Sequence, residues 1–266
     1  MEGQYGSAKA VAATTAQTIT WNVSDIPNGG YAALTFLTTG VNNHLGATTP
    51  GVSRIRVKDN NMPLIDVGPT AIRTFMEAES PSNTIPVTNQ LRWTLMTSLP
   101  GFPFRTGIPF GRKTSVEVDF NAANSSAGDI KLGYDMLNLP PEYEFKMLTQ
   151  QTNVAATATR GHVTLPTAPD ELLYGVIFPI VGATGITRAE VVVAGQQVCD
   201  LDQGLLLEGS QRTNPGTLTT TFFRRMSEFR PLTAGNSYIK LTTGAGAAVG
   251  DEITFITLRD LRVKAA

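Results

Sequence analysis

Apolar and polar residues alternate with a period of two along most of the chain, as in β-strands with one buried face. In Thr18–Val23, the apolar residues Ile19, Trp21 and Val23 share one face, and Ser115–Phe120 repeats the pattern. The same pattern predicts strands at Tyr31–Leu37, Ile55–Lys58, Leu91–Met96, Tyr174–Phe178, Ala189–Val193, Leu218–Phe223, Tyr238–Thr242 and Ile253–Leu258. Many short strands separated by Gly, Pro, Asn and Asp indicate a sandwich or barrel.

Two segments have a helical pattern instead. Pro69–Glu79 begins with proline, which suits the first turn of a helix, and its large apolar residues share one face. Glu142–Gln150 follows two prolines and places Phe145 and Leu148 together. The second segment precedes a Thr- and Ala-rich stretch, Gln151–Arg160, which is the best candidate for a domain boundary.

A duplication is the most informative feature of the sequence. Val52–Val67 and Ile186–Leu201 align without a gap, with residue numbers that differ by 134. Each copy predicts a hairpin of a strand, a turn and a second short strand, and each precedes a predicted helix, Pro69–Glu79 or Gln203–Gln211. The identical pairs are Arg54 and Arg188, Val57 and Val191, and Asp66 and Asp200.

Segments on both sides of the hairpins also match. Upstream, the matched pairs are Thr18–Val23 with His162–Leu165 and Tyr31–Gly40 with Leu172–Gly182. Downstream, Ser115–Phe120 is matched with Glu252–Thr257.

The matched order of elements predicts an all-β protein of two tandem eight-stranded jelly rolls, a double jelly roll, with a few short helices. The predicted ranges are an N-terminal arm at 1–17, a first jelly roll at 18–139, a helix and linker at 140–160 and a second jelly roll at 161–266. We expect the arm to lie outside the first sandwich and to be ordered by neighbouring subunits or by contacts on the inner face of the shell; the alternative is a plain disordered tail.

Composition excludes several classes of protein. Charged residues make up 16% of the chain and the net charge is −1, without the cluster of Lys and Arg that direct binding of nucleic acid requires. The single cysteine, Cys199, excludes an intrachain disulfide and a thiolate zinc site. The low charge fits either a surface covered by other subunits or a polar, uncharged surface. We expect neither a membrane-spanning helix nor a signal peptide.

Candidate chemistry is sparse. His44 and His162 lie in different segments without a paired ligand, and Asp200, Asp202 and Glu208 offer oxygen ligands for calcium without EF-hand spacing. Gly244–Gly250 lacks the Lys-Ser/Thr of a phosphate-binding loop, and we interpret it as a hairpin connection. The phenylalanine-rich Gly101–Phe110 is interpreted as a packed or interfacial loop. The sequence predicts no cofactor and no catalytic, cofactor-binding or metal-binding residue.

The repeated strand, hairpin and helix, in Ile55–Glu79 and Ala189–Gln211, resembles the double jelly-roll major capsid proteins of icosahedral viruses with an internal membrane, such as corticoviruses and tectiviruses. The resemblance implies a structural protein of a bacteriophage-like virion, without enzymatic activity, that is assembled in the host cytoplasm. It implies a homotrimer whose two jelly rolls per copy form a pseudo-hexameric capsomer. The implied partners are neighbouring capsomers, penton proteins and minor membrane-associated capsid proteins, with the inner face near the viral membrane and no sequence-specific nucleic acid.

Two other functions suit a double β-sandwich. One is a carbohydrate-binding or carbohydrate-active protein, although sugar sites usually present aromatic platforms and the chain has only Trp21 and Trp93. The other is a host-attachment or spike protein. Fold alone does not decide among these functions.

Overall fold

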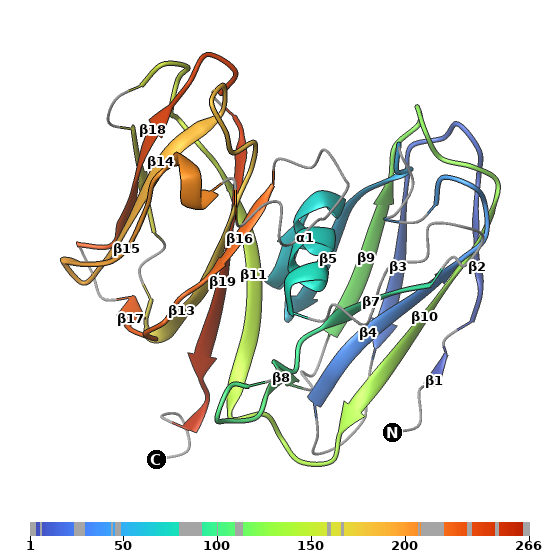
Figure 1. The fold of residues 1–266 in the computed structure, drawn as a ribbon. Coiled ribbons are helices and arrows are strands. Elements are labelled where there is room, and N and C mark those ends of the chain that lie inside the picture. The colour runs from blue at the N-terminus through green and yellow to red at the C-terminus, as the bar shows by residue number, and fades with distance from the viewer. Residues whose placement is uncertain are drawn as a thin grey trace. The chain divides into compact units, whose positions relative to one another are not determined.

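The computed structural model describes residues 4–5, 7–23, 30–43, 45, 49–79, 92–99, 101–109, 114–158, 161–165, 168–206, 208, 221–232, 236–247 and 250–262. The chain divides into two compact units between Leu148 and Thr149. Strands dominate both units (Figure 1). No helix in the described residues is both long and apolar enough to cross a membrane.

The first unit is a sandwich of two sheets with the strand orders β2-β10-β4-β7 and β3-β9-β5-β6. In addition, β1 pairs with β10, and β8 pairs with β4. The elements are β1 (Gln4–Tyr5), β2 (Lys9–Val11), β3 (Gln17–Val23), β4 (Gly30–Thr38), β5 (Val52–Asp59), β6 (Met62–Val67), α1 (Pro69–Glu79), β7 (Arg92–Met96), β8 (Thr106–Pro109), β9 (Thr114–Phe120) and β10 (Gly128–Leu137).

The second unit repeats this arrangement, with the strand orders β11-β19-β13-β16 and β12-β18-β14-β15. The short β17 also pairs with β13. The elements are β11 (Tyr143–Gln151), which begins in the first unit, β12 (Gly161–Thr164), β13 (Ala168–Phe178), β14 (Ile186–Val193), β15 (Gln196–Leu201), β16 (Phe222–Arg225), β17 (Pro231–Leu232), β18 (Tyr238–Thr243) and β19 (Glu252–Asp260). Eight strands in two four-stranded sheets form a jelly roll, so the predicted fold class is confirmed.

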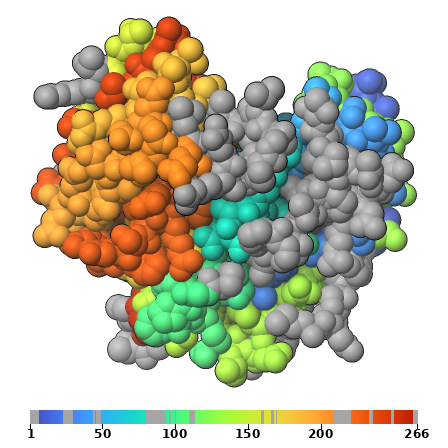
Figure 2. All heavy atoms as spheres, in the orientation of Figure 1, coloured from blue at the N-terminus to red at the C-terminus, as the bar shows by residue number. Residues whose placement is uncertain are grey.

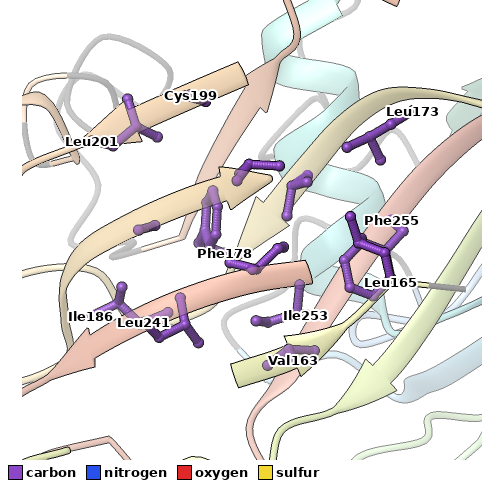
Figure 3. Packing of buried hydrophobic residues seen from close by; sticks show 14 of the residues in the cluster. Val163, Leu165, Leu173, Phe178, Ile186, Cys199, Leu201, Leu241, Ile253 and Phe255 are labelled. Carbon is purple, nitrogen blue, oxygen red and sulfur yellow. The ribbon is translucent and has the colours of Figure 1, made fainter. Parts of the chain in front are cut away.

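Each unit has its own hydrophobic core. In the first, α1 buries Ile72, Phe75 and Met76, as predicted from its apolar face, and the helix has the predicted bounds. In the second, Figure 3 shows Phe178 among apolar side chains that come from both sheets. These residues include Val163, Leu165, Leu173, Ile186, Cys199, Leu201, Leu241, Ile253 and Phe255.

The two predicted hairpins are confirmed, and their registers agree residue for residue. Val57 lies opposite Ile65 in the first hairpin, and Val191 lies opposite Cys199 in the second, again 134 residues further along the chain. In both hairpins the register shifts directly after this valine, which places a β-bulge at the same point. Both turns have two successive residues with positive φ, Asn60-Asn61 and Ala194-Gly195. Such turns match the twist of paired strands.

The equivalence extends to the remaining strands. Asp135 lies opposite Ala33 in β10 and β4, and Ile256 lies opposite Gly175 in β19 and β13, with a bulge next to both pairs. These pairs relate β4 to β13 by an offset of 142, from Ala33 to Gly175, and β10 to β19 by 121, from Asp135 to Ile256. The upstream match of Tyr31–Gly40 with Leu172–Gly182 is therefore confirmed. The match of Thr18–Val23 with His162–Leu165 is confirmed as well, because β3 and β12 lie at equivalent sheet edges, beside β9 and β18.

The downstream match is wrong. Strand β9 pairs with β3 and β5, and the strand that pairs with their counterparts β12 and β14 is β18. Glu252–Thr257 belongs to β19, the counterpart of β10. Apolar alternation alone did not distinguish β18 from β19, because both strands alternate. The interpretation of Gly244–Gly250 as a hairpin connection is also wrong, because the strands on either side of it, β18 and β19, lie in different sheets.

The predicted helix at Glu142–Gln150 is also wrong, because this segment forms β11. Tyr143, Phe145 and Met147 alternate along the strand and are almost fully buried. The period-two burial of these large side chains outweighs the helical spacing of Phe145 and Leu148. The segment predicted as a linker thus supplies a strand.

The expectation that residues 1–17 lie outside the first sandwich is wrong for Lys9–Val11. This segment is β2, which pairs with Gly128–Ile130 and buries Val11. The strand β10 was itself absent from the sequence prediction, although Ile130 and Leu132 alternate with polar residues and are buried. Three residues are too short a run for a recognisable period, so partner pairing decides the state of β2.

The helix predicted at Gln203–Gln211 is only partly described. Residues 203–206 and 208 are helical, and the other residues of the range lie outside the described part of the chain. The Leu206 N–H donates to the Asp202 carbonyl oxygen at 3.0 Å, as the Ile72 N–H does to Gly68 in α1. The two helices therefore start at equivalent positions.

The second hairpin turn should be easy to stabilise. Ala194 has φ 51°, where the equivalent Asn60 has φ 48°, and asparagine adopts this left-handed region at lower cost than alanine. We expect Ala194→Asn to raise the free energy of unfolding by about 0.5–1 kcal/mol in urea titrations. The reciprocal Asn60→Ala should lower it by a similar amount. Equal stability of all three proteins would contradict the turn assignment.

Candidate functional site

The two hairpins carry the same cross-strand ion pair. Arg54 Nε donates to Asp66 Oδ1 in the first hairpin. In the second, Arg188 Nε and Nη2 donate to the two carboxylate oxygens of Asp200 at 3.0 and 2.7 Å. Two of the three identities in the duplicated sequence therefore form one contact, which lies on the half-exposed face of each sheet. In both units this contact joins the two strands of the hairpin.

The next pair along the sheet keeps its position and reverses its charge. In the first unit, Arg56 on β5 lies opposite Glu117 on β9, with Nε 3.1 Å from Oε2. In the second, Glu190 on β14 lies opposite Lys240 on β18, with Nζ 3.0 Å from Oε2. The two equivalent faces thus have different charge patterns, which allows a binding partner to discriminate between them.

Edge strands of these two sheets differ in what covers them. In the first unit, β6 pairs with β5 and also, in parallel, with Met147–Leu148 of β11. In the second unit, the equivalent strand β15 pairs with β14 alone among the described strands. In Figure 2 the orange part of the chain around residue 200 reaches the surface of the face shown.

Burial follows the difference in coverage. Leu64 on β6 is 3% exposed, whereas its counterpart Val198 on β15 is half-buried. Ile65 is fully buried, whereas its counterpart Cys199 is 9% exposed. An uncovered strand edge presents unpaired N–H and C=O groups to a further chain, so the β15 edge is the candidate functional surface of this protein.

The ion pair with Arg188 favours the charged form of Asp200 on β15. The hydrogen bonds from Arg188 lower the pKa of Asp200, while burial raises the pKa of the Cys199 thiol. Since the pKa of Asp200 is lower in the folded state, its contribution to stability is present above the unfolded pKa and is lost as the pH falls through the folded one. The contribution should begin to decline as the pH falls below about 4 and should vanish only below the folded pKa.

We therefore expect Arg188→Ala to lower the melting temperature at pH 7 only slightly, by about 1–2 °C, because the pair is half-exposed and screened. The difference from the unchanged protein should shrink in 1 M salt and disappear at acid pH. Thermal melts at several pH values test this. A difference that persists at pH 2.5 would show that Arg188 acts through packing instead of charge.

The candidate metal and histidine chemistry does not converge on a site. His162 stacks on Tyr238, with ring centroids 5.1 Å apart, and His44 lies outside the described residues. Asp202 caps the short helix, since its Oδ1 accepts from the Leu205 N–H at 2.9 Å. Within the described ranges, no group of three His, Cys, Asp or Glu side chains is placed to hold a metal ion.

The phenylalanine-rich segment is packed in the first unit as far as it is described. Phe102 is almost buried, and the rings of Phe102 and Phe104 each lie 5.4 Å from that of Tyr143. Phe104 is 37% exposed, and Phe110 lies outside the described residues. This segment ends in β8, so its main role is to cover the edge of the core.

Comparison with known proteins gives matches to solved structures only: no family model and no curated sequence matches the chain. The major capsid protein P2 of bacteriophage PM2 matches with a TM-score of 0.66 and 12% identity, over 97% of this chain and 98% of that one. The major capsid protein of STIV, Sulfolobus turreted icosahedral virus, matches with a TM-score of 0.68 and 12% identity, over 100% and 99%. The PBCV-1 capsid gives a TM-score of 0.51 and 8% identity, over 97% and 94%.

The chain has the double jelly-roll fold. Similarity over the full length of both chains matches the strand orders described above, in which the eight strands of each unit correspond one to one. The double jelly roll therefore accounts for the duplicated hairpin as the best-preserved part of two equivalent domains. Sequence reasoning found the hairpin through Arg54 and Asp66, but the open edge of β15 has no signal in the sequence.

Proposed function

We propose that this double jelly-roll protein is the major capsid protein of an icosahedral virus with an internal membrane. The observation that carries the proposal is the full-length structural similarity to the capsid proteins of PM2 and STIV, with two jelly rolls in each chain. Low charge supports it, because much of a capsid protein's surface contacts other subunits.

The proposed unit of assembly is a homotrimer. Each copy contributes two equivalent sandwiches, so three copies around one axis contribute six similar bodies and form a pseudo-hexameric capsomer. In the virion, the capsomer would contact neighbouring capsomers, penton proteins and minor membrane-associated proteins. We propose no catalytic role, and assembly in the host cytoplasm.

Mass photometry of the purified protein tests the trimer. We expect a species of about 85 kDa, three times the chain mass of 28.4 kDa, that persists at micromolar concentration. A stable interface of this kind buries more than about 2,000 Å² and should resist dilution. A 28.4 kDa monomer at all concentrations, together with specific binding on a glycan array, would favour the carbohydrate-binding alternative instead.

A further inference from the structure

The strand that covers β6 has a counterpart at the start of the chain. The Thr152 N–H donates to Asp251, and the Gly250 N–H donates to Thr152, both at 2.8 Å. In the first unit, Ala10 lies opposite Asp129. Asp129 and its neighbour Ile130, which lies opposite Lys9, correspond to Gly250 and Asp251 by the offset of 121 that relates β10 to β19. Lys9–Ala10 and Thr152 therefore occupy equivalent places in the two units.

These offsets predict which strand should pair with the open edge of β15. Met147 of β11 pairs in parallel with Ile65 of β6. The counterpart of Ile65 is Cys199, by the offset of 134. Tyr5 of β1 lies opposite Gly133, whose counterpart by the offset of 121 is Thr254, and the Thr254 hydroxyl lies 2.9 Å from that of Thr149 on β11. Tyr5 therefore takes the place of Thr149, two residues after Met147, and its expected neighbour on β15 is Leu201, two residues after Cys199.

The strand β1 has an edge available for this pairing. One edge of β1 pairs with β10, where Tyr5 lies opposite Gly133, and β1 is the last strand of its sheet among the described residues. In the described part of the chain, β1 and β15 thus each have an open edge, whereas their counterparts β11 and β6 are paired with each other.

We propose that β1 of a second copy pairs in parallel with β15, with Tyr5 opposite Leu201. This inference rests on the proposed function, since it names the contact that joins the subunits of the capsomer. In the first unit, the occupant of the edge comes from the start of the next jelly roll. At the β15 edge of the second unit, we assign this place to β1 of another copy, because β1 is the counterpart of β11.

The geometry of this contact explains a closed ring. The two edges are different, so the contact is head-to-tail, and such contacts close into rings when the rotation permits. Three copies give three identical contacts of this kind, alternating with the three β6–β11 contacts within the chains. Pairing along strand edges is a common mode of association between chains. It also removes an exposed edge that would otherwise promote aggregation.

Disulfide trapping tests the register once Cys199, the only cysteine of the chain, is replaced by serine. Paired residues on neighbouring strands lie about 5 Å apart, within the Cα separation that a disulfide spans. In the Cys199→Ser background, we expect Tyr5→Cys combined with Leu201→Cys, assembled under mild oxidation, to give covalent trimers on non-reducing gels, with dimers as intermediates. The matched control, Gln4→Cys with Leu201→Cys, is one residue out of register, and its cysteine should point to the other face and cross-link at least tenfold less. Tyr5→Cys without Leu201→Cys should give none.

The outcomes separate the inference from the proposed function. Trimers in solution without the Tyr5→Cys cross-link, or with a disulfide formed within one chain, would overturn the edge pairing and leave the capsomer standing. Absence of any trimer would contradict both. Should the variant fail to fold, hydrogen exchange on the unchanged protein gives the answer. The amides of Gln197–Asp200 should be protected in the oligomer and lose that protection on dissociation, and fast exchange in the oligomer would overturn the pairing.

Discussion

Phe178→Ala should lower the free energy of unfolding by about 3–5 kcal/mol, the range measured for loss of a buried phenylalanine. Phe178 is fully buried in the core of the second unit (Figure 3), where its ring is stacked on that of Phe222 with centroids 6.5 Å apart. The two residues also lie opposite each other in the strand pair β13 and β16. Removing the ring leaves a cavity between the two sheets. Because strand pairing holds each sheet in place, the sheets cannot move together to fill the cavity.

Urea unfolding monitored by circular dichroism measures this effect. Leu205→Ala is the matched control, because Leu205 is a large apolar residue that is 49% exposed in the short helix of the same unit. Its effect should stay within about 0.5 kcal/mol. A loss below 1 kcal/mol for Phe178→Ala would contradict the two-layer core of the second unit.

Val198→Lys should convert the proposed trimer into monomers. The counterpart of Val198 on the covered strand, Leu64, is 3% exposed, so occupation of the β15 edge should bury residue 198 to a similar extent. An unpaired ammonium group buried in this way costs several kcal/mol for each contact. In the monomer, Val198 is only half-buried, and a lysine there extends its charged end into water. We expect the dissociation constant to rise by at least 10³-fold.

The control at the same position is Val198→Leu, which installs the residue that the first unit has. This variant should keep the trimer at the concentration at which Val198→Lys is monomeric in mass photometry. Melting temperatures of the two variants as monomers should lie within a few degrees of each other. Trimers of Val198→Lys with unchanged affinity would show that β15 is not at the subunit interface.

Local patterning predicted most of the strands and the two hairpins. Alternation identified β3, β4, β5, β9 and β14, and the proline and apolar face of Pro69–Glu79 gave α1 its observed bounds. These elements have long periodic runs or strong end signals, so local sequence determines them. The identity of Arg54 with Arg188 and of Asp66 with Asp200 indicated the duplication, and the structure shows that these residues form a repeated ion pair.

Features that depend on partners were not predictable in this way. The segment Tyr143–Gln151 satisfies both a helical and a strand pattern, and pairing with neighbouring strands decides for the strand. The three residues of β2 carry no period of their own. The reversal of charge between Arg56 and Glu190 becomes visible only when the register relates the two units. The open edge of β15 is visible only from the sheet topology, which shows no described strand beside β15 other than β14.

Cryo-electron microscopy of the purified oligomer tests the central claim most directly. We expect three copies around a threefold axis, six jelly rolls in a pseudo-hexagon, and β1 of each copy paired with β15 of the next. A monomer, a twofold dimer, or a trimer in which β15 faces solvent would contradict it. The first two outcomes would refute the capsomer, and the third would refute the edge pairing alone.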